Sequence, residues 1–586
     1  PFIIVSSLRN EINSYGNCTC YALSALPLNR PLAGQMDDDE QKVLRCRVAV
    51  VGAGASGLAA AQSLLPRLQG DGSVEPLVIL EGRNRTGGRI HTLPLNADKQ
   101  TRFLVDMGAA WVHGTGVAFG EDGKGENEEL NPMVKILQKR KDLSKEMINE
   151  DPLKAGLLYT CPKGNQDTRP RDVLHSSNLL ELYVGGNRIK RNSLDISAAL
   201  DLYEKILSTA SKVGTDAYNC GEGMSTTTIS IGQTIDCIRS QASGRSGLKY
   251  QFGNNEEESN EVESLLGYYF HSLQDWHPHE LSNIQLSEFI VEEQENDLGG
   301  DEGDYPGPHC NVRGGMATLL DPLLENGVKD CILCEHEVVR IERRQNNSSD
   351  TILIKCLNGT KMLADYCIVT ISIGCLKAGV ISDLFAPNLS NEKLEAISML
   401  QMGSYRKVFL LFDKIFWPAE TPFFGLVRAS VQSPELWGTE DFYGLGNYLN
   451  VYSFARDGIA CLEVTLGGKG ARWISGRSDE DIREEVLSFL DDSMHVEDGS
   501  SFSDRCTGCH VTRWEEDRFS MGAYAGFKLG TLERHAESLG KSEWAGRLIF
   551  AGDAVIPEYE GSVHGALLSG EEAARNVMER IFCNAE

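Results

Sequence analysis

The feature that most constrains the fold is a glycine-rich turn between an apolar run and an alanine-rich run. Gly52, Gly54 and Gly57 have the spacing G-x-G-x-x-G between a strand predicted at "RVAVV" and a helix predicted over 55–69. The first glycine permits the tight turn, the second lets backbone approach a pyrophosphate, and the third allows close helix–strand packing. The phosphate then faces the N–H groups at the helix N-terminus. The stretch therefore predicts a Rossmann-type dinucleotide site.

A carboxylate lies at the end of the next predicted strand, "EPLVILEG", and two arginines follow it. Glu81 ends that strand, where an acid accepts from ribose hydroxyls and fits FAD or NAD better than NADP. The stretch 80–92, "LEGRNRTGGRIHT", makes a second tight turn at Gly88 and is expected to place Arg83 and Arg89 beside the pyrophosphate. Enzymes that use a nicotinamide cofactor have no need of this second stretch. It resembles the GG-doublet pattern of flavoproteins, an acidic residue followed by R-x-x-x-GGR, and this resemblance favours FAD.

The C-terminal region predicts a third part of the same site. "RLIFAGDA" indicates a strand ending in Gly552 and Asp553, whose carboxylate is expected to accept from the ribitol or to approach the pyrophosphate through water. "GSVHGALLSG" then opens a helix at Ser562 and Val563. Its N-terminal N–H groups are expected to face the pyrimidine carbonyl of a flavin, where negative charge accumulates on reduction. His564 has a small-residue helix start around it, which favours structural packing over a role as a base.

The net charge and the hydropathy of the chain limit the classes of partner that we expect it to bind. The chain carries 56 basic and 84 acidic residues, a formal net charge of −28, which disfavours nucleic acid and anionic membranes. Such a charge suits a cationic substrate, although an acidic surface is also common in proteins without one. No stretch approaches the ~20 apolar residues of a transmembrane helix, so none is expected.

The 16 cysteines show no regular framework, which predicts mostly reduced thiols in an intracellular protein. A cytoplasmic location is expected, with an organelle or secretion as the alternatives. Cys331 and Cys334 fall in a strand-like run whose alternating side chains point to opposite faces, so we expect no metal site there. Cys506 and Cys509, in "CTGCH", match a haem-attachment pattern. Without other haem features, a chance match or a loop disulfide is favoured.

The predicted fold class is α/β of mixed α+β character, because strand and helix signals alternate over 45–113. Two domains are expected, because 586 residues exceed what one hydrophobic core usually supports. We expect a discontinuous Rossmann-type FAD-binding domain and a second, substrate-binding domain of mixed sheet and helices. The predicted order is an N-terminal extension or leader (1–44), FAD-binding parts at 45–115, 305–375 and 506–586, and substrate-binding parts at 116–304, with acidic insertions, and 376–505.

Five stretches, taken in order, resemble the flavin-containing amine oxidases, the superfamily of monoamine oxidases, polyamine oxidases and histone demethylases. They are "VVGAGASGLAAA", "LEGRNRTGGRIHT", "DMGAAWVHG", "RKVFLLFDKIFWP" and "AGDAVIPEYEGSVHGALLSG". The resemblance spans roughly 45–582 and implies FAD as the cofactor. It is closest to polyamine oxidase and spermine oxidase.

The resemblance also implies roles for single residues. Lys407 matches the lysine whose ammonium holds a water beside flavin N5, and Trp514 matches a tryptophan that contacts the flavin. Tyr524 matches one wall of an aromatic sandwich around the substrate amine, and His113, in "WVHG", matches a histidine that contacts polyamine substrates. Val339 matches the strand residue whose backbone meets adenine. From the residues alone, Lys407 fits an edge-strand lysine and His113 a loop histidine equally well.

Ser562 departs from the family pattern, because many members carry the second aromatic wall at that position. Spermine-oxidase-like enzymes and histone demethylases have a small hydroxyl residue there, so a monoamine oxidase is disfavoured. A histone-demethylase-like oxidase stays an alternative, favoured by similarity around 417–427 and disfavoured by His113. A flavin-binding structural subunit without oxidase activity is a second alternative.

The reaction that the resemblance implies is oxidation of a small polycationic amine. A hydride leaves the carbon next to nitrogen for flavin N5, O2 reoxidises the flavin to give hydrogen peroxide, and water hydrolyses the imine. The amine must be neutral to react. Acidic groups farther out are then expected to attract the remaining ammonium groups.

Overall fold

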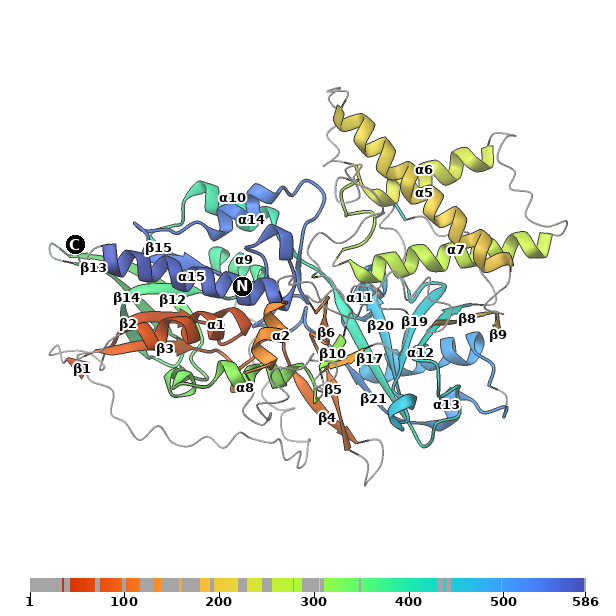
Figure 1. Ribbon diagram of the computed structural model, residues 1–586, viewed down its shortest axis with the longest axis horizontal. Helices are drawn as coiled ribbons and strands as arrows, with labels where there is room; N and C mark the ends of the chain where they lie inside the picture. The colour runs from red at the N-terminus through yellow and green to blue at the C-terminus, as the bar shows by residue number, and fades with distance from the viewer. Residues whose placement is uncertain are drawn as a thin grey trace, which may run out of the picture.

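A computed structural model of the chain, shown in Figure 1, forms two parts side by side. The residues that the structure describes are 34–35, 43–68, 74–96, 102–115, 130–139, 158–160, 180–189, 194–219, 229–244, 256–277, 279–286, 305, 310–312, 314–346, 349–428, 437–438, 444–496 and 498–583. Each part is built on one large sheet, as the mixed α/β prediction required. Most of residues 1–44 and the acid-rich stretches within 116–304 lie outside the described residues.

The first part is a nine-stranded sheet with a parallel centre. Its path is β11 (Ile332–Leu333), β3 (Glu75–Leu80), β2 (Val43–Val51), β14 (Lys361–Val369), β13 (Ser349–Cys356), β12 (Val338–Asn346) and β15 (Phe385–Ala386), with β1 (Gly34–Gln35) beside β2 and β23 (Leu548–Phe550) beside β14. The strands β11, β3, β2, β14 and β23 pair in parallel. The predicted Rossmann-type core is therefore present.

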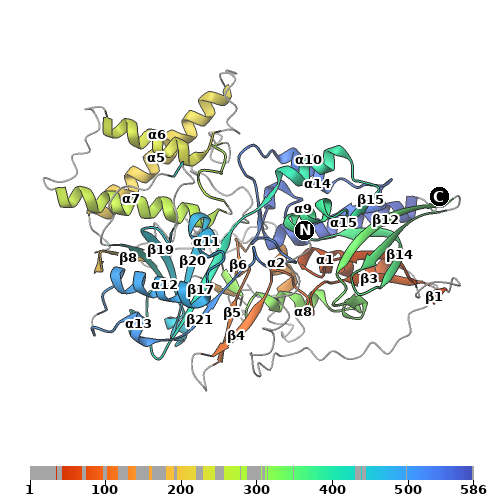
Figure 2. The same cartoon turned by 180° about the vertical axis from the view of Figure 1, so that it is seen from behind.

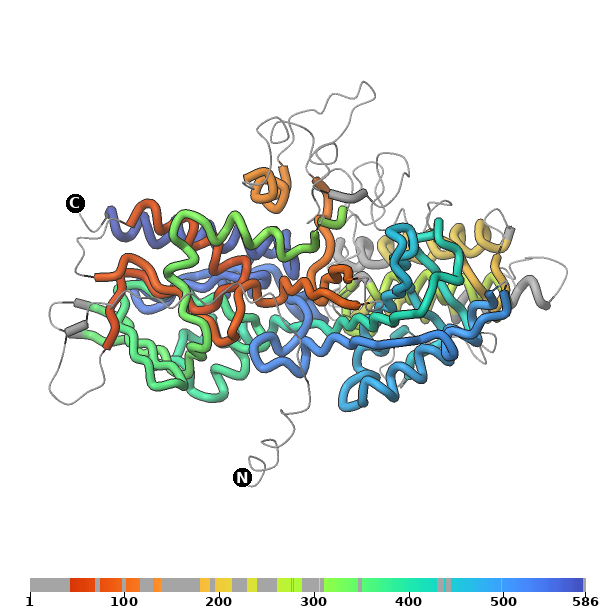
Figure 3. The backbone as a smooth tube through the Cα atoms, turned by 90° about the horizontal axis from the view of Figure 1, so that it is seen from below, coloured from red at the N-terminus to blue at the C-terminus, as the bar shows by residue number. Residues whose placement is uncertain are grey.

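Helices cover both faces of this sheet. On one face α1 (Ala55–Leu64) packs along α15 (Val563–Cys583), so the first and last helices of the fold lie side by side (Figure 3). Leu58 and three successive alanines of α1 are almost completely buried, which explains the alanine-rich sequence. The helix ends before the predicted residue 69 because Pro66 converts its end to a 3₁₀ turn. The remaining helices of this part are α2 (Pro132–Leu137), α8 (Leu320–Leu323), α9 (Ile373–Ile381), α10 (Asn391–Met399) and α14 (Glu533–Gly540).

The second part is a seven-stranded sheet between two helical layers. Its order is β21 (Cys506–Val511), β17 (Tyr405–Phe412), β20 (Cys461–Gly467), β19 (Tyr448–Ser453), β18 (Phe423–Val427), β8 (Leu180–Val184) and β9 (Asn187–Arg188). Figures 1 and 2 show α5 (Leu194–Asn219), α6 (Ile231–Gly244) and α7 (Glu256–Trp276) on one side, and α12 (Asp479–Ser493) and α13 (Phe502–Arg505) on the other. The helix α11 (Gly468–Ile474) continues directly from β20.

Three small sheets complete the described strands. They are β4 (Thr92–Asn96) with β5 (Arg102–Asp106), β6 (Trp111–Val112) with β10 (Cys310–Val312) and β7 (Leu158–Thr160), and β16 (Gln401–Met402) with β22 (Ala525–Gly526). Among the described residues, no helix combines the length and apolar character that a bilayer crossing requires.

The helix α2, predicted within the substrate-binding part 116–304, packs into the core of the nine-stranded sheet. Two further predicted domain boundaries also differ from the structure. The segment 384–400, predicted for the substrate-binding domain, packs into the core of the nine-stranded sheet, where β15 pairs with β12. The segment 506–511, predicted for the FAD-binding domain, is the edge strand of the seven-stranded sheet, paired with β17. Periodicity identifies an element but not the sheet it joins, which explains both differences.

Candidate active site

A single cavity of about 2800 Å³ runs between the two sheets. Ligand pockets are usually ~300–1,000 Å³, so this cavity has room for a dinucleotide and a substrate together. It brings together all but one of the predicted site residues, drawn from segments far apart in sequence. They are Gly52, Gly54, Glu81, Arg83, Gly88, Arg89, His113, Val339, Lys407, Trp514, Tyr524, Gly552, Asp553, Ser562 and Val563.

The three glycines of the first turn have different surroundings. Gly52 has φ +108°, a conformation that L side chains rarely adopt, and a Cβ there would lie 2.7 Å from Thr370 Oγ1. A Cβ on Gly57, the predicted site residue outside the cavity lining, would lie 2.0 Å from the carbonyl oxygen of Gly52. A Cβ on Gly54 would meet no atom within 4 Å. Gly54 therefore leaves open the space at the start of α1, where the helix has no side-chain cap.

The second tight turn closes on the first. Gly88 has φ +59°, and a Cβ there would lie 3.5 Å from the Cα of Gly54. Glu81 is 6% exposed, and its carboxylate accepts hydrogen bonds from the backbone N–H groups of Ala53 and Arg83, each at 2.8 Å. These bonds fix the carboxylate at the cavity wall, where the sequence places a ribose.

The two predicted arginines have acidic partners within the protein. Arg89 forms a bidentate pair with Asp553, at 2.7 and 2.6 Å, and Asp553 also accepts from the Ala525 N–H at 3.0 Å. Burial opposes the ionised carboxyl, but the Arg89 guanidinium outweighs it and holds the pKa of Asp553 below its usual value. Arg83 pairs with Asp517 at 3.0 Å. The ribitol contact expected of Asp553 stays a prediction, since Arg89 engages both of its oxygens.

Val339 lies at a bulge of β12 that leaves its backbone outside the ladder. Val338 pairs with Cys356 and Arg340 with Lys355, so Val339 is skipped in the register. It is 39% exposed and lines the cavity. A backbone free of the ladder at the cavity wall is suited to meet an adenine edge. Gly552 also lines the cavity, and a Cβ there would meet no atom within 4 Å.

Lys407 points from β17 into the cavity and is 5% exposed. Its Nζ donates to the backbone oxygen of Asp106 at 3.0 Å and lies 3.2 Å from Oε1 of Glu463. Burial raises the pKa of Glu463, and the Lys407 ammonium opposes that rise. This lysine is therefore a cavity residue with an acidic partner, which excludes the alternative of an edge-strand lysine in solvent.

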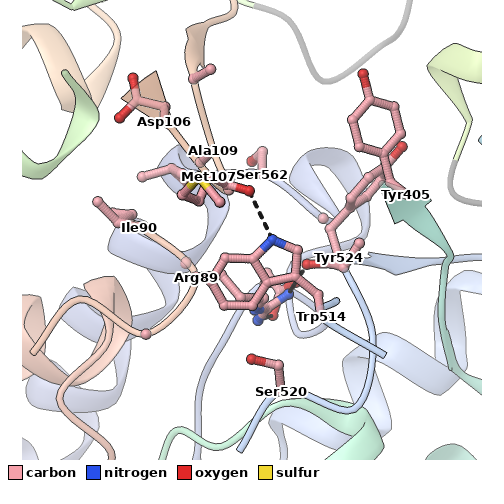
Figure 4. A pocket seen from close by; sticks show the side chains of 18 of the residues that line it. Arg89, Ile90, Asp106, Met107, Ala109, Tyr405, Trp514, Ser520, Tyr524 and Ser562 are labelled. Atoms are coloured by element: carbon pink, nitrogen blue, oxygen red, sulfur yellow. Dashed lines mark hydrogen bonds and ion pairs between the residues drawn. The ribbon is translucent and has the colours of Figure 1, made fainter. Parts of the chain in front are cut away.

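Aromatic side chains form one wall near Lys407. The rings of Tyr405 and Tyr524 have centroids 6.1 Å apart at 59°, and Figure 4 shows them together on one side of the cavity. Trp514 is 8% exposed and its Nε1 donates to the Met107 backbone oxygen at 2.9 Å, which fixes the indole at the cavity wall (Figure 4). Burial raises the pKa of Tyr405 well above its usual value, so the phenol stays neutral.

His113 and Ser562 both line the cavity. His113 follows β6, and its backbone oxygen accepts from Asn131 Nδ2 at 3.2 Å. Ser562 caps α15, since its Oγ accepts from the Gly565 N–H at 2.9 Å and donates to the Tyr559 backbone oxygen at 2.8 Å. Val563 begins that helix. The serine therefore has a structural role that an aromatic residue could not fill.

His564, expected to be structural, is 2% exposed and packs edge-on against Tyr559 with ring centroids 5.1 Å apart. Cys506 and Cys509 lie on the strand β21 and are free thiols, so the loop disulfide is not formed. Cys331 and Cys334 are also free thiols and flank β11. In the described part of the chain, no group of three or more His, Cys, Asp or Glu side chains is placed to hold a metal ion.

Several polar residues of the cavity were missed from the sequence, among them Tyr405, Glu463, Asp275 and Asn450. Asp275 accepts from Asn450 Nδ2 at 2.8 Å and from the Gly467 N–H at 3.0 Å, so it ties α7 to the sheet. A signal existed for Glu463, which interrupts the apolar strand "CLEVTL". Tyr405 could have been found by its period of two with Lys407.

Comparison with known proteins gives a family. Residues 55–121 and 240–578 match the sequence profile described as "Flavin containing amine oxidoreductase". "Probable polyamine oxidase 4" of Arabidopsis thaliana is 27% identical over 547 residues, 93% of this chain and 89% of that protein. "Lysine-specific histone demethylase 1 homolog 2" of Oryza sativa subsp. japonica is also 27% identical, over 92% of this chain but 58% of that protein. The chain thus spans little more than half of that demethylase.

A solved structure of a redesigned putrescine oxidase superposes with a TM-score of 0.55 at 17% identity, covering 92% of this chain and 100% of that one. At this identity the likeness concerns the fold.

Proposed function

Because the chain belongs to the family of flavin-containing amine oxidoreductases and is an FAD-dependent amine oxidase, we propose that its substrates are polyamines of the spermine and spermidine type. The observation that carries the proposal is the continuity of the cavity. It runs from the glycine turn at Gly54 to the face of the seven-stranded sheet that carries Lys407 and Glu463. The net charge of −28 favours the approach of a polycation.

The residues at one end of the cavity fit FAD. Gly54 and the uncapped start of α1 suit the pyrophosphate, Glu81 the ribose, the bulged backbone at Val339 the adenine, and the indole of Trp514 the flavin. When bound, FAD supplies the oxidant that accepts a hydride from the carbon next to the amine nitrogen.

At the other end the protein binds and orients the amine. Tyr405 and Tyr524 offer aromatic faces on which an alkylamine can lie. Two N–H groups of Lys407 are used by Asp106 and Glu463, so a third can hold a water in the cavity. His113, which also lines the cavity, is placed to contact the substrate chain. These roles, like turnover with O2 and a cytoplasmic location, are part of the proposal.

The test is anaerobic bleaching of the flavin in the purified holoenzyme. Spermine and spermidine should bleach it fastest, their acetylated forms should separate the branches of polyamine oxidases, and a monoamine should act slowly. With air admitted, hydrogen peroxide should appear in proportion to the amine consumed. Bleaching by none of these compounds would refute the substrate class.

A second candidate is an oxidase of methylated lysine in a protein, favoured by the 27% identity to a histone demethylase over 92% of this chain. A dimethyl-lysine peptide belongs in the same experiment for that reason. Bleaching by the peptide alone would replace the polyamine proposal. Bound flavin with no response to any amine would favour a structural subunit.

A further inference from the structure

A buried glutamate faces Lys407 across two neighbouring strands. Lys407 pairs in register with Thr465 and Glu463 with Phe409, so both charged side chains lie on the cavity face of the sheet. Their charged atoms are 3.2 Å apart, and both side chains are largely buried, at 6% and 12% exposure. The polyamine proposal does not itself require a carboxylate at this position.

The cavity poses an electrostatic problem that this carboxylate solves. An amine substrate brings positive charge into a site that already holds an ammonium, and like charges repel strongly where water is excluded. A buried lysine without a partner is also costly in itself. Glu463 offsets the ammonium of Lys407 at close range, so that an incoming cation meets a pair rather than a lone charge.

We propose that Glu463 is a specificity-determining residue, which compensates Lys407 and makes this part of the cavity accept a cationic amine. The inference rests on the proposed function, because it takes a protonated amine as the ligand that must enter. It assigns Glu463 no contact with the reacting atoms.

Other charged and titratable groups face the pair from the elements packed around it. The carboxyl of Asp106, on β5, is held by the Met316 N–H at 2.9 Å, and burial raises its pKa. Asp275 approaches from α7, and the phenols of Tyr405 and Tyr524 complete the set. Replacing an ionised Glu463 by glutamine raises the net charge of this part of the cavity by one unit, and this change is the same whether Asp106 is protonated or ionised.

The chain provides a matched control on the same strand. Arg406 points to the opposite face of β17 and pairs with Glu515 at 3.0 Å. Arg406 is completely buried, and Glu515 is 17% exposed. Neither residue lines the cavity. Arg406 also pairs with Glu516 at 3.1 Å, and Glu515 Oε1 accepts from the Tyr405 N–H at 3.0 Å, a bond that a glutamine oxygen can equally accept. Glu515→Gln therefore removes a carboxylate charge beside a buried cation without changing the charges that line the cavity.

The experiment measures binding of two unreactive probes to holoenzyme through the change that each causes in the flavin absorbance. One is an alkyl-trimethylammonium, which has no nitrogen lone pair and so cannot be oxidised as an amine. The other is its uncharged tert-butyl isostere. A unit charge at about 6 Å in a medium of effective dielectric about 40 changes affinity by about tenfold. Glu463→Gln should weaken the cation by about that factor and leave the isostere unchanged.

Three further variants separate charge from folding. Glu515→Gln should leave the cation-to-isostere affinity ratio at its wild-type value, Glu463→Asp should largely retain it, and Lys407→Met combined with Glu463→Gln should restore it. An unchanged ratio in Glu463→Gln, or equal weakening of both probes, overturns the inference. Because probe binding needs no turnover, a shifted ratio without oxidation of any amine would refute the proposed function alone. Turnover with an unshifted ratio would refute the inference alone.

Discussion

The contrast between Gly54 and Gly57 gives a test in which two alanine substitutions, three residues apart, should act on different properties. A Cβ on Gly57 would lie 2.0 Å from the Gly52 carbonyl oxygen, whereas ordinary contact begins at 3.4 Å, so the turn must move by 1.4 Å. A displacement of this size belongs at the upper end of overpacking costs, about 3 kcal/mol. The oxygen that must move belongs to the phosphate-binding turn itself.

Gly54→Ala should behave differently. Gly54 has φ −80° and ψ −176°, an extended conformation that alanine adopts without strain, and its Cβ would meet no atom within 4 Å. Such a substitution usually changes stability by less than about 1 kcal/mol and can be stabilising. The added methyl would project into the space assigned to the pyrophosphate. The apo fold should therefore be retained while FAD affinity falls by at least about tenfold.

The assay is thermal unfolding of the flavin-stripped proteins together with titration of FAD into each. Gly57→Ala should lower the unfolding temperature of the apoprotein, and Gly54→Ala should leave it near wild type while losing the cofactor. Gly54→Ala binding FAD as tightly as wild type would refute the placement of the pyrophosphate. A Gly57→Ala apoprotein as stable as wild type would refute the packing of this turn.

Three further outcomes are expected. Lys407→Met should slow flavin reduction or reoxidation without releasing FAD, because the Nζ contacts to Asp106 and Glu463 lie beside the substrate end of the cavity. Stopped-flow absorbance measures both half-reactions. Asp553→Asn should cost about 3 kcal/mol by leaving Arg89 unpaired. Folding lowers the pKa of Asp553, so its carboxylate stabilises the folded protein above the unfolded-state pKa near 3.8, and this stabilisation is lost as the pH falls further. The unfolding temperature of Asp553→Asn should therefore decrease less steeply with falling pH than that of the wild type, as measured by thermal scans at a series of pH values. Burial lowers the pKa of Lys393 to about 7. The free energy of unfolding of the wild type should therefore rise by about 1.4 kcal/mol per pH unit between pH ~7 and pH ~10, because only the unfolded state binds the proton in that range. Denaturant titrations should show that Lys393→Met abolishes this rise.

The cofactor end of the site was predictable because its signals are local. One turn contains Gly52, Gly54 and Gly57. Their spacing alone indicates which glycine permits the bend, which leaves space open and which allows close packing. The doublet that contains Gly88 docks on Gly54, as expected if both turns serve one ligand. The partner of Arg89 was not predictable, because Asp553 is more than four hundred residues away and no local pattern links them.

The residues at the substrate end were harder to predict, because they alternate along strands that are not adjacent in sequence. Tyr405 and Lys407 come from β17, Glu463 from β20 and Asn450 from β19. Their meeting depends on strand order and register, which hydrophobic periodicity does not specify. The same limit explains the displaced domain boundary at 384–400, since a short helix or strand carries no mark of the sheet it joins.

A charged residue in an apolar strand nevertheless carries long-range information. Burial without a partner would cost a carboxylate several kcal/mol, so the glutamate in "CLEVTL" implies a cation on the facing element. Lys407 is the cation that interrupts the apolar strand "YRKVFLLF" on its inward face, while Arg406, one residue earlier, points to the other face. Two buried charges of opposite sign, each interrupting an apolar strand, thus indicate a shared face, although they fix neither the strand order nor the strand direction. In this protein that face is the one turned towards the cavity, so the pair that the fold requires is also the pair that a ligand in the cavity meets.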